Sequence, residues 1–262
     1  MTNNYKKIVL AANTDWYLYN FRRNLIVLLQ NYGFKTYVIS PAGNYVRKLQ
    51  NLGCTYIPWK VGRQSISPLT ELQSIIDLKN IYQDIAPDII HHHTLKTVIY
   101  GNFASRSHEI PLINSIPGRG YIYSSQSLKA KMLQPMVDFL LKLSMSYPNQ
   151  QVIFENPADM DYFLKKQFVK KDQSHLIQSV GVDTNYYQPS QIPDFQDFTV
   201  GYVGRMLWDK GVGIFVDAAR SVRSTNPQIK MVLIGLPDAG NPASISTEQL
   251  RSWQEEGIIE WW

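Results

Sequence analysis

The stretch FTVGYVGRMLWDKG, residues 198–211, decides the fold class of this chain. It begins as a short apolar run with β-branched and aromatic residues, which predicts a buried parallel strand. It then opens at Gly204 into a loop before a helix that starts near Gly211. The loop carries Arg205 and Lys210, and the helix N-terminus adds partial positive charge at the same place. This combination at the carboxyl end of a parallel strand indicates a diphosphate site, and two solvated surface cations are the alternative.

Strand and helix patterns alternate along the whole chain, which is typical of parallel sheets with helices on both faces. Strands are predicted over residues 7–12, 36–40, 56–58, 88–92, 112–116, 151–154, 175–179, 198–203, 231–235 and 258–261, and the main helices over residues 21–32, 69–85, 98–107, 127–146, 157–166, 212–224 and 247–256. A polar, proline-containing stretch over residues 186–197 predicts a linker. We therefore expect an α/β protein with an N-terminal Rossmann-like domain over residues 1–185 and a C-terminal domain over residues 198–262.

Further stretches, in order along the chain, carry a resemblance to a known family. They are WYLYNFRRNL (16–25), PDIIHHHTLKTVIYG (87–101), FENPADMDYF (154–163), GVDTNYYQP (181–189), GRMLWDKGVGIFVDAARSVR (204–223), IGLPDAGNPASIS (234–246) and GIIEWW (257–262). The chain resembles family 4 glycosyltransferases, retaining enzymes of the GT-B fold, in the bacterial branch that builds capsule, O-antigen and lipid-linked oligosaccharides. The resemblance implies transfer from a nucleotide diphosphate sugar, with a UDP-sugar expected, to a lipid-linked or polysaccharide acceptor.

The resemblance also implies how the donor is held. In that family the residues equivalent to Arg205 and Lys210 bind the donor diphosphate, and Gly204 lets a ligand approach the backbone. Charge that develops on the leaving diphosphate is then stabilised without a divalent ion, so we expect neither a metal nor a cofactor. The departing phosphate takes the acceptor's proton in this mechanism, and we assign no catalytic residue.

The C-terminal domain is expected to be incomplete, because residues 198–262 are few for a doubly wound domain. In the resembled family the next segment holds an EGFPR-like loop and paired glutamates that engage the donor. Glu248 and Glu256 match the spacing of that pair, but on a polar helix, where a solvated face is favoured. We therefore expect a C-terminally truncated transferase, through a premature stop, a split gene or an engineered cut. A second chain could supply the missing segment, and a non-catalytic remnant or acceptor-binding module is the alternative.

Composition indicates the kind of partner and the compartment. A net charge of +5 indicates an anionic partner. The sequence shows no arginine-rich arm, zinc pattern or RNA-binding motif, so we expect nucleotide-sugar and an anionic lipid surface rather than nucleic acid. A single cysteine excludes an internal disulfide, and no apolar run reaches the ~18 residues of a membrane span. These features predict a cytoplasmic protein, with peripheral attachment to the inner face of the plasma membrane as a further expectation.

Three consecutive histidines end the strand predicted over residues 88–92. Because successive strand residues alternate faces, His91, His92 and His93 are not expected to share one metal ion. His93, nearest the carboxyl end, is a candidate for contact with substrate, and a structural role in the sheet is the alternative. Lys96, in the loop expected next, is either a phosphate contact or a solvated lysine.

Two further loops supply candidates for the acceptor side of the cleft. The first, over residues 13–17, begins with Asn13, and its Trp16 could stack on a sugar while Arg22 just beyond binds pyrophosphate. Packing of Trp16 onto the sheet is the alternative.

The second loop is NSIPGRG, residues 114–120, where Gly118 and Gly120 permit close approach of a ligand. Arg119 is either a contact to acceptor phosphate or a surface charge. Pro117 stands where the resembled branch usually has threonine, which leaves the role of this loop open.

The helix predicted over residues 127–146 carries an apolar stripe with lysines near its rim. The stripe consists of Leu133, Met136, Val137, Leu140 and Leu141, and the lysines are Lys129, Lys131 and Lys142. Docking on a membrane surface is one interpretation of this stripe, and packing against the protein core is the other.

Overall fold

The computed structural model describes residues 6–62, 67–107, 109–124, 127–189, 198–238 and 241–262. It divides into two compact units, unit 1 (Met1–Tyr187) and unit 2 (Gln188–Trp262). Residues 190–197 of the predicted linker lie outside the described residues. Each unit contains one parallel sheet, which confirms the predicted α/β class.

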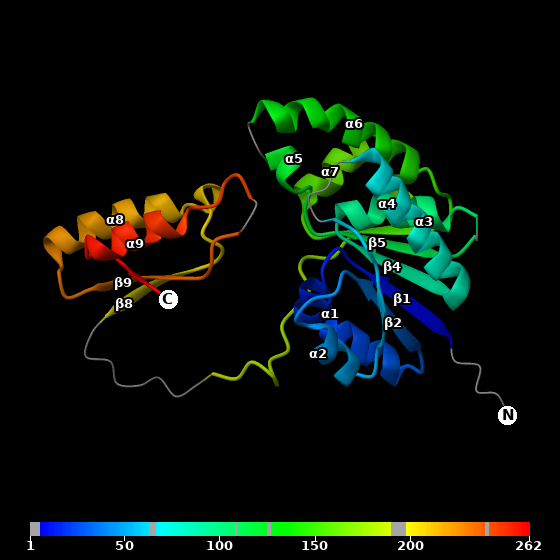
Figure 1. Ribbon diagram of the computed structural model, residues 1–262, viewed down its shortest axis with the longest axis horizontal. Helices are drawn as coiled ribbons and strands as arrows, with labels where there is room; N and C mark the ends of the chain where they lie inside the picture. Colours follow the sequence, from blue (N-terminus) through cyan, green and yellow to red (C-terminus); the bar gives the residue numbers. More distant parts are fainter. Residues whose placement is uncertain (1–5, 63–66, 108, 125–126, 190–197, 239–240) are drawn as a thin grey trace. The chain divides into compact units, whose positions relative to one another are not determined.

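Unit 1 is built on a parallel sheet with the strand order β3-β2-β1-β4-β5-β6-β7 (Figure 1). The strands are β1 (Lys7–Ala11), β2 (Lys35–Ser40), β3 (Thr55–Pro58), β4 (Ile89–His93), β5 (Leu112–Ile116), β6 (Gln150–Phe154) and β7 (Ser174–Leu176). Because β4 returns to pair with β1 after β2 and β3 have extended the sheet the other way, the strand order reverses between β1 and β4. In open parallel sheets, ligands bind at such a reversal, beyond the carboxyl ends of the strands.

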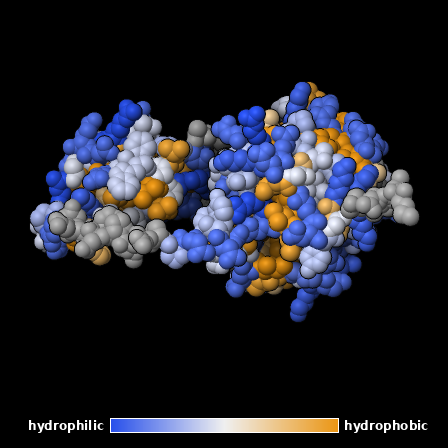
Figure 2. All heavy atoms as spheres, turned by 90° about the horizontal axis from the view of Figure 1, so that it is seen from below, coloured by the Kyte–Doolittle hydropathy of each residue, from blue (hydrophilic) through white to orange (hydrophobic). Residues whose placement is uncertain are grey.

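Helices cover both faces of this sheet. They are α1 (Asp15–Asn31), α2 (Val46–Asn51), α3 (Pro68–Ile85), α4 (Leu95–Ser105), α5 (Tyr121–Ser124), α6 (Leu128–Ser144), α7 (Pro157–Lys165) and the 3₁₀ helix η1 (Lys171–Gln173). Val9 and Ala11 of β1 pack in the core shared with α3, α4 and α6, whereas Ile8 and Leu10 pack in the core shared with α1 and α2 (Figure 1). Figure 2 views the side of α1 and α2, where apolar groups lie within a mostly hydrophilic surface.

Two helices begin earlier than the sequence pattern indicates. The prediction that α1 starts at residue 21 is wrong, because Thr14 caps it and accepts a hydrogen bond from the Tyr17 N–H at 3.1 Å. Trp16 therefore lies in the first turn of the helix rather than in a loop. Lys96 likewise lies in the first turn of α4, not in the loop predicted for it.

The apolar stripe predicted on α6 faces the protein interior for the most part. Val137 and Leu141 are 8% and 0% exposed, and Leu133 and Leu140 are half-buried. Met136 is the one exposed member of the predicted stripe. Packing against the core is therefore the correct interpretation of the buried members of this stripe, and Met136 lies outside that core.

Unit 2 has a smaller parallel sheet with the order β10-β9-β8. Its elements are β8 (Thr199–Val203), the 3₁₀ helix η2 (Trp208–Lys210), α8 (Val212–Thr225), β9 (Lys230–Ile234), α9 (Thr247–Glu255) and β10 (Glu260–Trp261). The helices α8 and α9 lie on one face of the sheet (Figure 1), and Val216, Leu250 and Leu233 belong to one buried core. Among the described residues of both units, no helix combines the length and apolar character needed to cross a bilayer.

Candidate functional site

The carboxyl ends of β8 and β9 lie against each other at the loop predicted to bind an anion. The Gly204 N–H donates to the Ile234 carbonyl oxygen at 3.0 Å. A Cβ on Gly235, whose φ is +143°, would lie 1.9 Å from the Gly204 carbonyl oxygen. Only glycine fits at that position without moving the loop, so the close approach fixes Gly204 where the loop begins.

Arg205 is held at one end and open to solvent at the other. Its Nη1 donates to Asp238 Oδ2 at 2.7 Å, and the two side chains are 54% and 13% exposed. Asp238 is itself fixed, because Asn241 Nδ2 donates to the same carboxylate oxygen at 3.2 Å and the Asp238 N–H donates to Ser244 Oγ at 3.0 Å. The guanidinium is thus oriented by a well-anchored carboxylate while more than half of the side chain stays accessible.

Lys210 ends η2 directly before α8. Gly211, with φ of +80°, makes the turn into α8, and its N–H donates to the Trp208 carbonyl oxygen at 3.1 Å. The Lys210 side chain is exposed. The backbone carbonyl oxygen of Lys210 accepts a hydrogen bond from Tyr202 Oη at 3.2 Å. The loop between β8 and α8 therefore carries both predicted cations at the carboxyl edge of the sheet of unit 2.

A second candidate site lies in unit 1, where the carboxyl ends of β1 and β4 meet. Asn13, just after β1, is half-buried, and His93, the last residue of β4, is 0% exposed. Thr94 follows with φ of +73°, which residues other than glycine seldom adopt. Backbone in such sparsely populated regions clusters at functional sites, so this geometry supports the choice of this sheet edge.

Arg22 joins three elements of unit 1 at this edge. Its Nε donates to His93 Nδ1 at 3.1 Å, and its Nη2 donates to Tyr17 Oη at 2.6 Å and pairs with Glu155 Oε1 at 3.2 Å. Because arginine keeps its protons, His93 Nδ1 must be the acceptor, which leaves the ring proton on Nε2. In the part of the chain that the structure describes, this buried Nε2–H has no hydrogen-bond partner. The arrangement therefore holds a neutral imidazole that can donate one hydrogen bond.

The three histidines of β4 are neutral at physiological pH. Burial lowers the pKa of His91 to about 3, with a further contribution from the charge of Arg22. Burial also lowers the pKa of His92 to about 4 and that of His93 well below its ordinary value. His92 Nδ1 and Nε2 pair with Asn114 Oδ1 and Tyr82 Oη, both at 2.9 Å.

The rings of His91 and His93 lie 4.0 Å apart on the same face of the sheet. Among the described residues, no cluster of three or more His, Cys, Asp and Glu side chains is placed to hold a metal ion.

Trp16 and Lys96 differ from what their sequence context indicates. Trp16 is 48% exposed and meets Phe21 edge to face, so packing of its ring onto the sheet is wrong. Lys96 Nζ pairs with Glu71 Oε2 at 2.8 Å and donates to the Gly62 carbonyl oxygen at 2.6 Å. The interpretation of Lys96 as a solvated loop lysine is therefore also wrong.

Arg119 in the loop after β5 is paired rather than free. Its Nε donates to Asp159 Oδ1 at 2.6 Å, and the guanidinium carbon lies 4.5 Å from the centre of the Tyr162 ring. A Cβ on Gly118 would meet nothing within 4 Å, whereas Gly120 has φ of +73°. The backbone thus requires glycine at position 120, and position 118 leaves open space beside the loop.

Sequence reasoning missed two carboxylates that organise these sites, Glu155 and Asp238. Each lies in a stretch that carries the family resemblance, within FENPADMDYF and IGLPDAGNPASIS. Their partners Arg22 and Arg205 are 133 and 33 residues away in the chain. The position of each acidic residue after a predicted strand suggests that it lies near a site. The sequence does not show which arginine it pairs with.

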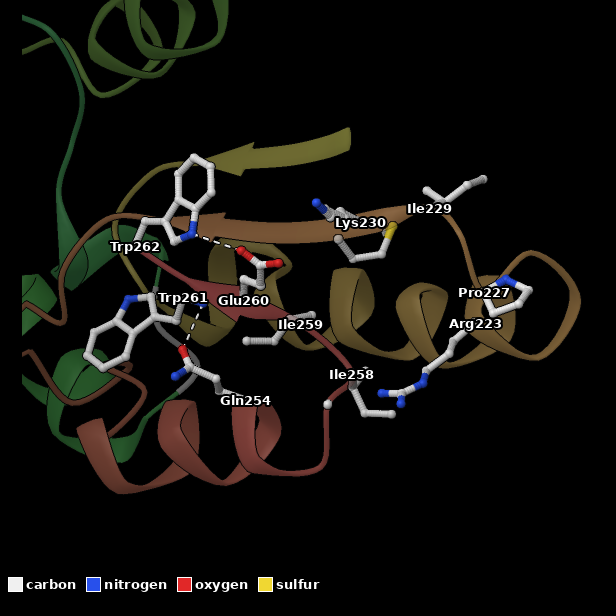
Figure 3. Close-up of a pocket in the computed structure, with 12 residues that line it drawn as sticks. Arg223, Pro227, Ile229, Lys230, Gln254, Ile258, Ile259, Glu260, Trp261 and Trp262 are labelled. Atoms are coloured by element: carbon white, nitrogen blue, oxygen red, sulfur yellow. Dashed lines mark hydrogen bonds between the residues drawn. The ribbon is translucent and has the colours of Figure 1, made fainter. Parts of the chain in front are cut away.

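A hollow of about 580 Å³ runs along the edge strand β10 in unit 2 (Figure 3). Trp261 and Trp262 line it, and the Trp262 Nε1–H donates to Glu260 Oε2 at 3.2 Å, while Gln254 Oε1 accepts from the Trp261 N–H at 3.0 Å. Arg205 is not among its lining residues, nor is any other residue of the β8–α8 loop. The hollow therefore belongs to the sheet edge and not to the anion-binding loop.

The family model described as "Glycosyl transferase 4-like" matches residues 7–156. The chain belongs to this family. The matched segment contains Arg22, His93 and Glu155, which unit 1 brings together at the edge of its sheet.

Two curated proteins are similar to the chain. The N,N'-diacetylbacillosaminyl-diphospho-undecaprenol alpha-1,3-N-acetylgalactosaminyltransferase of Campylobacter jejuni is 26% identical over 248 residues, which cover 90% of this chain and 64% of the relative. The capsular polysaccharide biosynthesis glycosyltransferase CapM of Staphylococcus aureus is 21% identical over 227 residues, which cover 84% of this chain and 58% of the relative. The chain thus spans less than two thirds of the length of either relative.

Solved structures support the fold. Anabaena HepE in complex with UDP-glucose matches with a TM-score of 0.68 at 17% identity, over 98% of this chain and 68% of that protein. Identity this low shows the fold alone, and the fold is GT-B, as predicted from the sequence.

Proposed function

We propose that this chain acts in glycosyl transfer, as a family 4 glycosyltransferase in the synthesis of bacterial surface polysaccharide or lipid-linked sugar. The match to the glycosyl transferase 4-like model supports this, as do the activities named for the Campylobacter and Staphylococcus relatives. The expected donor is a UDP-sugar, and the expected acceptor is a lipid-linked saccharide. We expect the chain to act at the cytoplasmic side of the membrane.

The donor diphosphate binds, in this proposal, to the β8–α8 loop of unit 2. The main support for this proposal is the geometry of Arg205. Asp238 orients its guanidinium through an ion pair, while 54% of the Arg205 side chain stays exposed to solvent. Lys210 and the N-terminus of α8 add positive potential on the same loop. Gly204 permits the phosphates to approach the backbone closely.

The acceptor side is assigned to the edge of unit 1 that carries His93. His93 would donate its buried Nε2–H, and Arg22 would act behind it by fixing the tautomer. Trp16 offers an exposed ring on which a sugar can stack, and Asn13 lies at the adjacent strand end.

The other candidates on this side have supporting roles in the proposal. Carboxylates hold Lys96 of α4 and Arg119 of the loop after β5, so in this proposal both cations stabilise local structure rather than bind phosphate directly. Gly118 leaves space beside its loop for a ligand.

In the proposed reaction the bond between the sugar's anomeric carbon and the β-phosphate oxygen breaks, and a bond to the acceptor hydroxyl oxygen forms on the same face. The departing phosphate takes the hydroxyl proton. Arg205 and Lys210 stabilise the charge that develops on the diphosphate, with no divalent ion or cofactor required.

Calorimetric titration of the chain with UDP and UDP-sugars, with EDTA present, tests this proposal. We expect Arg205→Ala and Lys210→Ala each to weaken binding by about 1.5 to 3 kcal/mol. Arg220→Ala on α8 removes an equal charge from exposed ion pairs with Asp217 and Glu256, and it is the matched control with no expected effect on UDP binding. Equal binding by all variants would exclude the β8–α8 loop as the donor site. Absence of binding by the folded chain would favour an acceptor-binding module or a need for a second chain.

A further inference from the structure

Helix α6 has a second apolar face that points away from the core of unit 1. Its members are large apolar side chains with exposed fractions between 42% and 80%, namely Leu128 (80%), Met132 (80%), Met136 (49%), Phe139 (65%) and Leu143 (42%). Spacings of three and four residues place them on one side of the helix, which we call the α6 ridge. The ridge extends over about 22 Å along the helix axis. Globular surfaces usually carry large apolar side chains singly, so a continuous ridge indicates a surface that is covered in use.

Basic residues lie beside the α6 ridge. Lys131 and Lys142 are both exposed, and their separation of three helical turns places them along one margin of the ridge. Arg106 reaches the C-terminal end of α6, where it donates to the Leu143 carbonyl oxygen and to Ser146 Oγ.

The helix offers no exposed carboxylate to balance these cations. Asp138 is the one acidic residue in the sequence of α6, and Lys166 pairs with it at 3.0 Å while Tyr123 Oη donates to it at 2.7 Å. An apolar ridge with a cationic margin is complementary to a surface that is apolar inside and anionic at its rim.

An anionic bilayer has that combination. Helices that lie in the bilayer interface insert Leu, Met and Phe side chains below the headgroups and hold Lys side chains at headgroup level. A protein partner would need a matching groove with an acidic rim, whereas a bilayer needs no such shape. The opposite apolar face of α6 is already used, since Val137 and Leu141 are buried in the core.

We propose that the α6 ridge docks unit 1 on an anionic lipid surface, with its apolar side chains inserted and with Lys131 and Lys142 at the headgroups. This names the membrane contact of the proposed transferase, and it rests on that function only for the identity of the lipid-linked acceptor. Docking itself requires no donor and no catalysis.

Co-sedimentation of the full chain with vesicles tests the proposal. We expect binding to phosphatidylcholine vesicles that contain phosphatidylglycerol, and much weaker binding to phosphatidylcholine alone or at high salt. The double variant Met132→Ser/Phe139→Ser should lower the partition coefficient by about tenfold or more. Replacing Lys131 and Lys142 with Gln should lower it by about fivefold for each lysine, on the anionic vesicles only.

The matched control is Val27→Ser/Leu28→Ser on α1. These two side chains are 39% and 51% exposed on α1, in the other helix layer of unit 1, and their loss should leave vesicle binding unchanged. Circular dichroism of each variant establishes that it is folded.

Three results would overturn the proposal. The first is wild-type chain that stays in the supernatant with anionic vesicles, and the second is a ridge variant that binds these vesicles as wild type does. The third is self-association that the ridge variant abolishes without any vesicle binding, because the ridge would then contact a second copy of the chain. A chain that binds vesicles but not UDP would contradict the donor-site proposal and leave the docking intact.

Discussion

At the scale of single residues, the pairing of Arg205 with Asp238 is the most informative contact in unit 2. Asp238 restrains the guanidinium before any ligand arrives, which reduces the entropy that phosphate binding must overcome. We predict that Asp238→Ala weakens UDP binding by about 1 kcal/mol and that Asp238→Ala/Arg205→Ala is no worse than Arg205→Ala. Calorimetry measures both values, with Asp217→Ala on α8 as the control. Tighter binding by Asp238→Ala would mean that the carboxylate competes with phosphate.

The buried histidines of β4 make the stability of unit 1 depend on pH. Their pKa values in the folded chain lie below the ordinary value, to about 3 for His91 and about 4 for His92. The unfolded chain therefore binds protons first as the pH falls below ~6.5. The free energy of unfolding should be level near neutral pH and should fall on acidification toward pH ~4, by on the order of 1.4 kcal/mol per pH unit for each histidine.

Urea unfolding at several pH values measures this slope. A His92→Gln variant lacks one titrating group and should show a shallower slope. Equal stability of the wild-type chain across this window would contradict the neutral, buried state of the three rings.

At the scale of elements, α1 distinguishes two neighbouring arginines. Arg22 is 8% exposed and bonds to His93, Tyr17 and Glu155, whereas Arg23 meets Asp183 at 3.5 Å nearer the surface. We predict that Arg22→Ala lowers the free energy of unfolding by about 3 kcal/mol, because it leaves a partly buried carboxylate unpaired. Arg23→Ala should cost less than about 1 kcal/mol. Equal losses in denaturant unfolding would contradict this difference.

The elements also show what could be predicted from the sequence. Apolar runs bounded by turn residues predict the strands β1 to β6 well, because buried parallel strands read directly as such runs. Apolar periodicity alone places the start of α1 near residue 21, whereas the capping residue Thr14 indicates the observed start at Asp15. The start of α4 could not be predicted, since it depends on the positive φ of Thr94.

The candidate sites were predictable only in part. Local sequence at strand ends identifies Arg205 and Lys210 in unit 2 and His93 in unit 1, and the parallel topology places each at the carboxyl edge of its own sheet. Glu155 and Asp238 were missed because their arginine partners come from other segments of the chain. The sequence analysis placed exposed Met136 in one stripe with buried Val137 and Leu141, because both faces of α6 are apolar and only packing shows which one is buried.

At the scale of the whole molecule, each unit has its own hydrophobic packing, with two cores in unit 1 and one in unit 2 among the described residues. Leu233 is 0% exposed in the core of unit 2. We predict that Leu233→Ala destabilises unit 2 by about 2 to 5 kcal/mol and shifts one calorimetric transition while the transition of unit 1 stays in place. Saturating UDP should raise the transition that Leu233→Ala lowers. A single cooperative transition that shifts as a whole would contradict the independence of the units.

The central claim is that a nucleotide diphosphate binds at the β8–α8 loop, and mapping of amide chemical shifts during titration of the labelled chain with UDP tests it most directly. The account predicts the largest shifts at residues 204–206 and 210–214, with smaller ones at Asp238, and their loss in Arg205→Ala. Shifts concentrated at Trp261 and Trp262, along the hollow beside β10, or at His93 in unit 1, would contradict it.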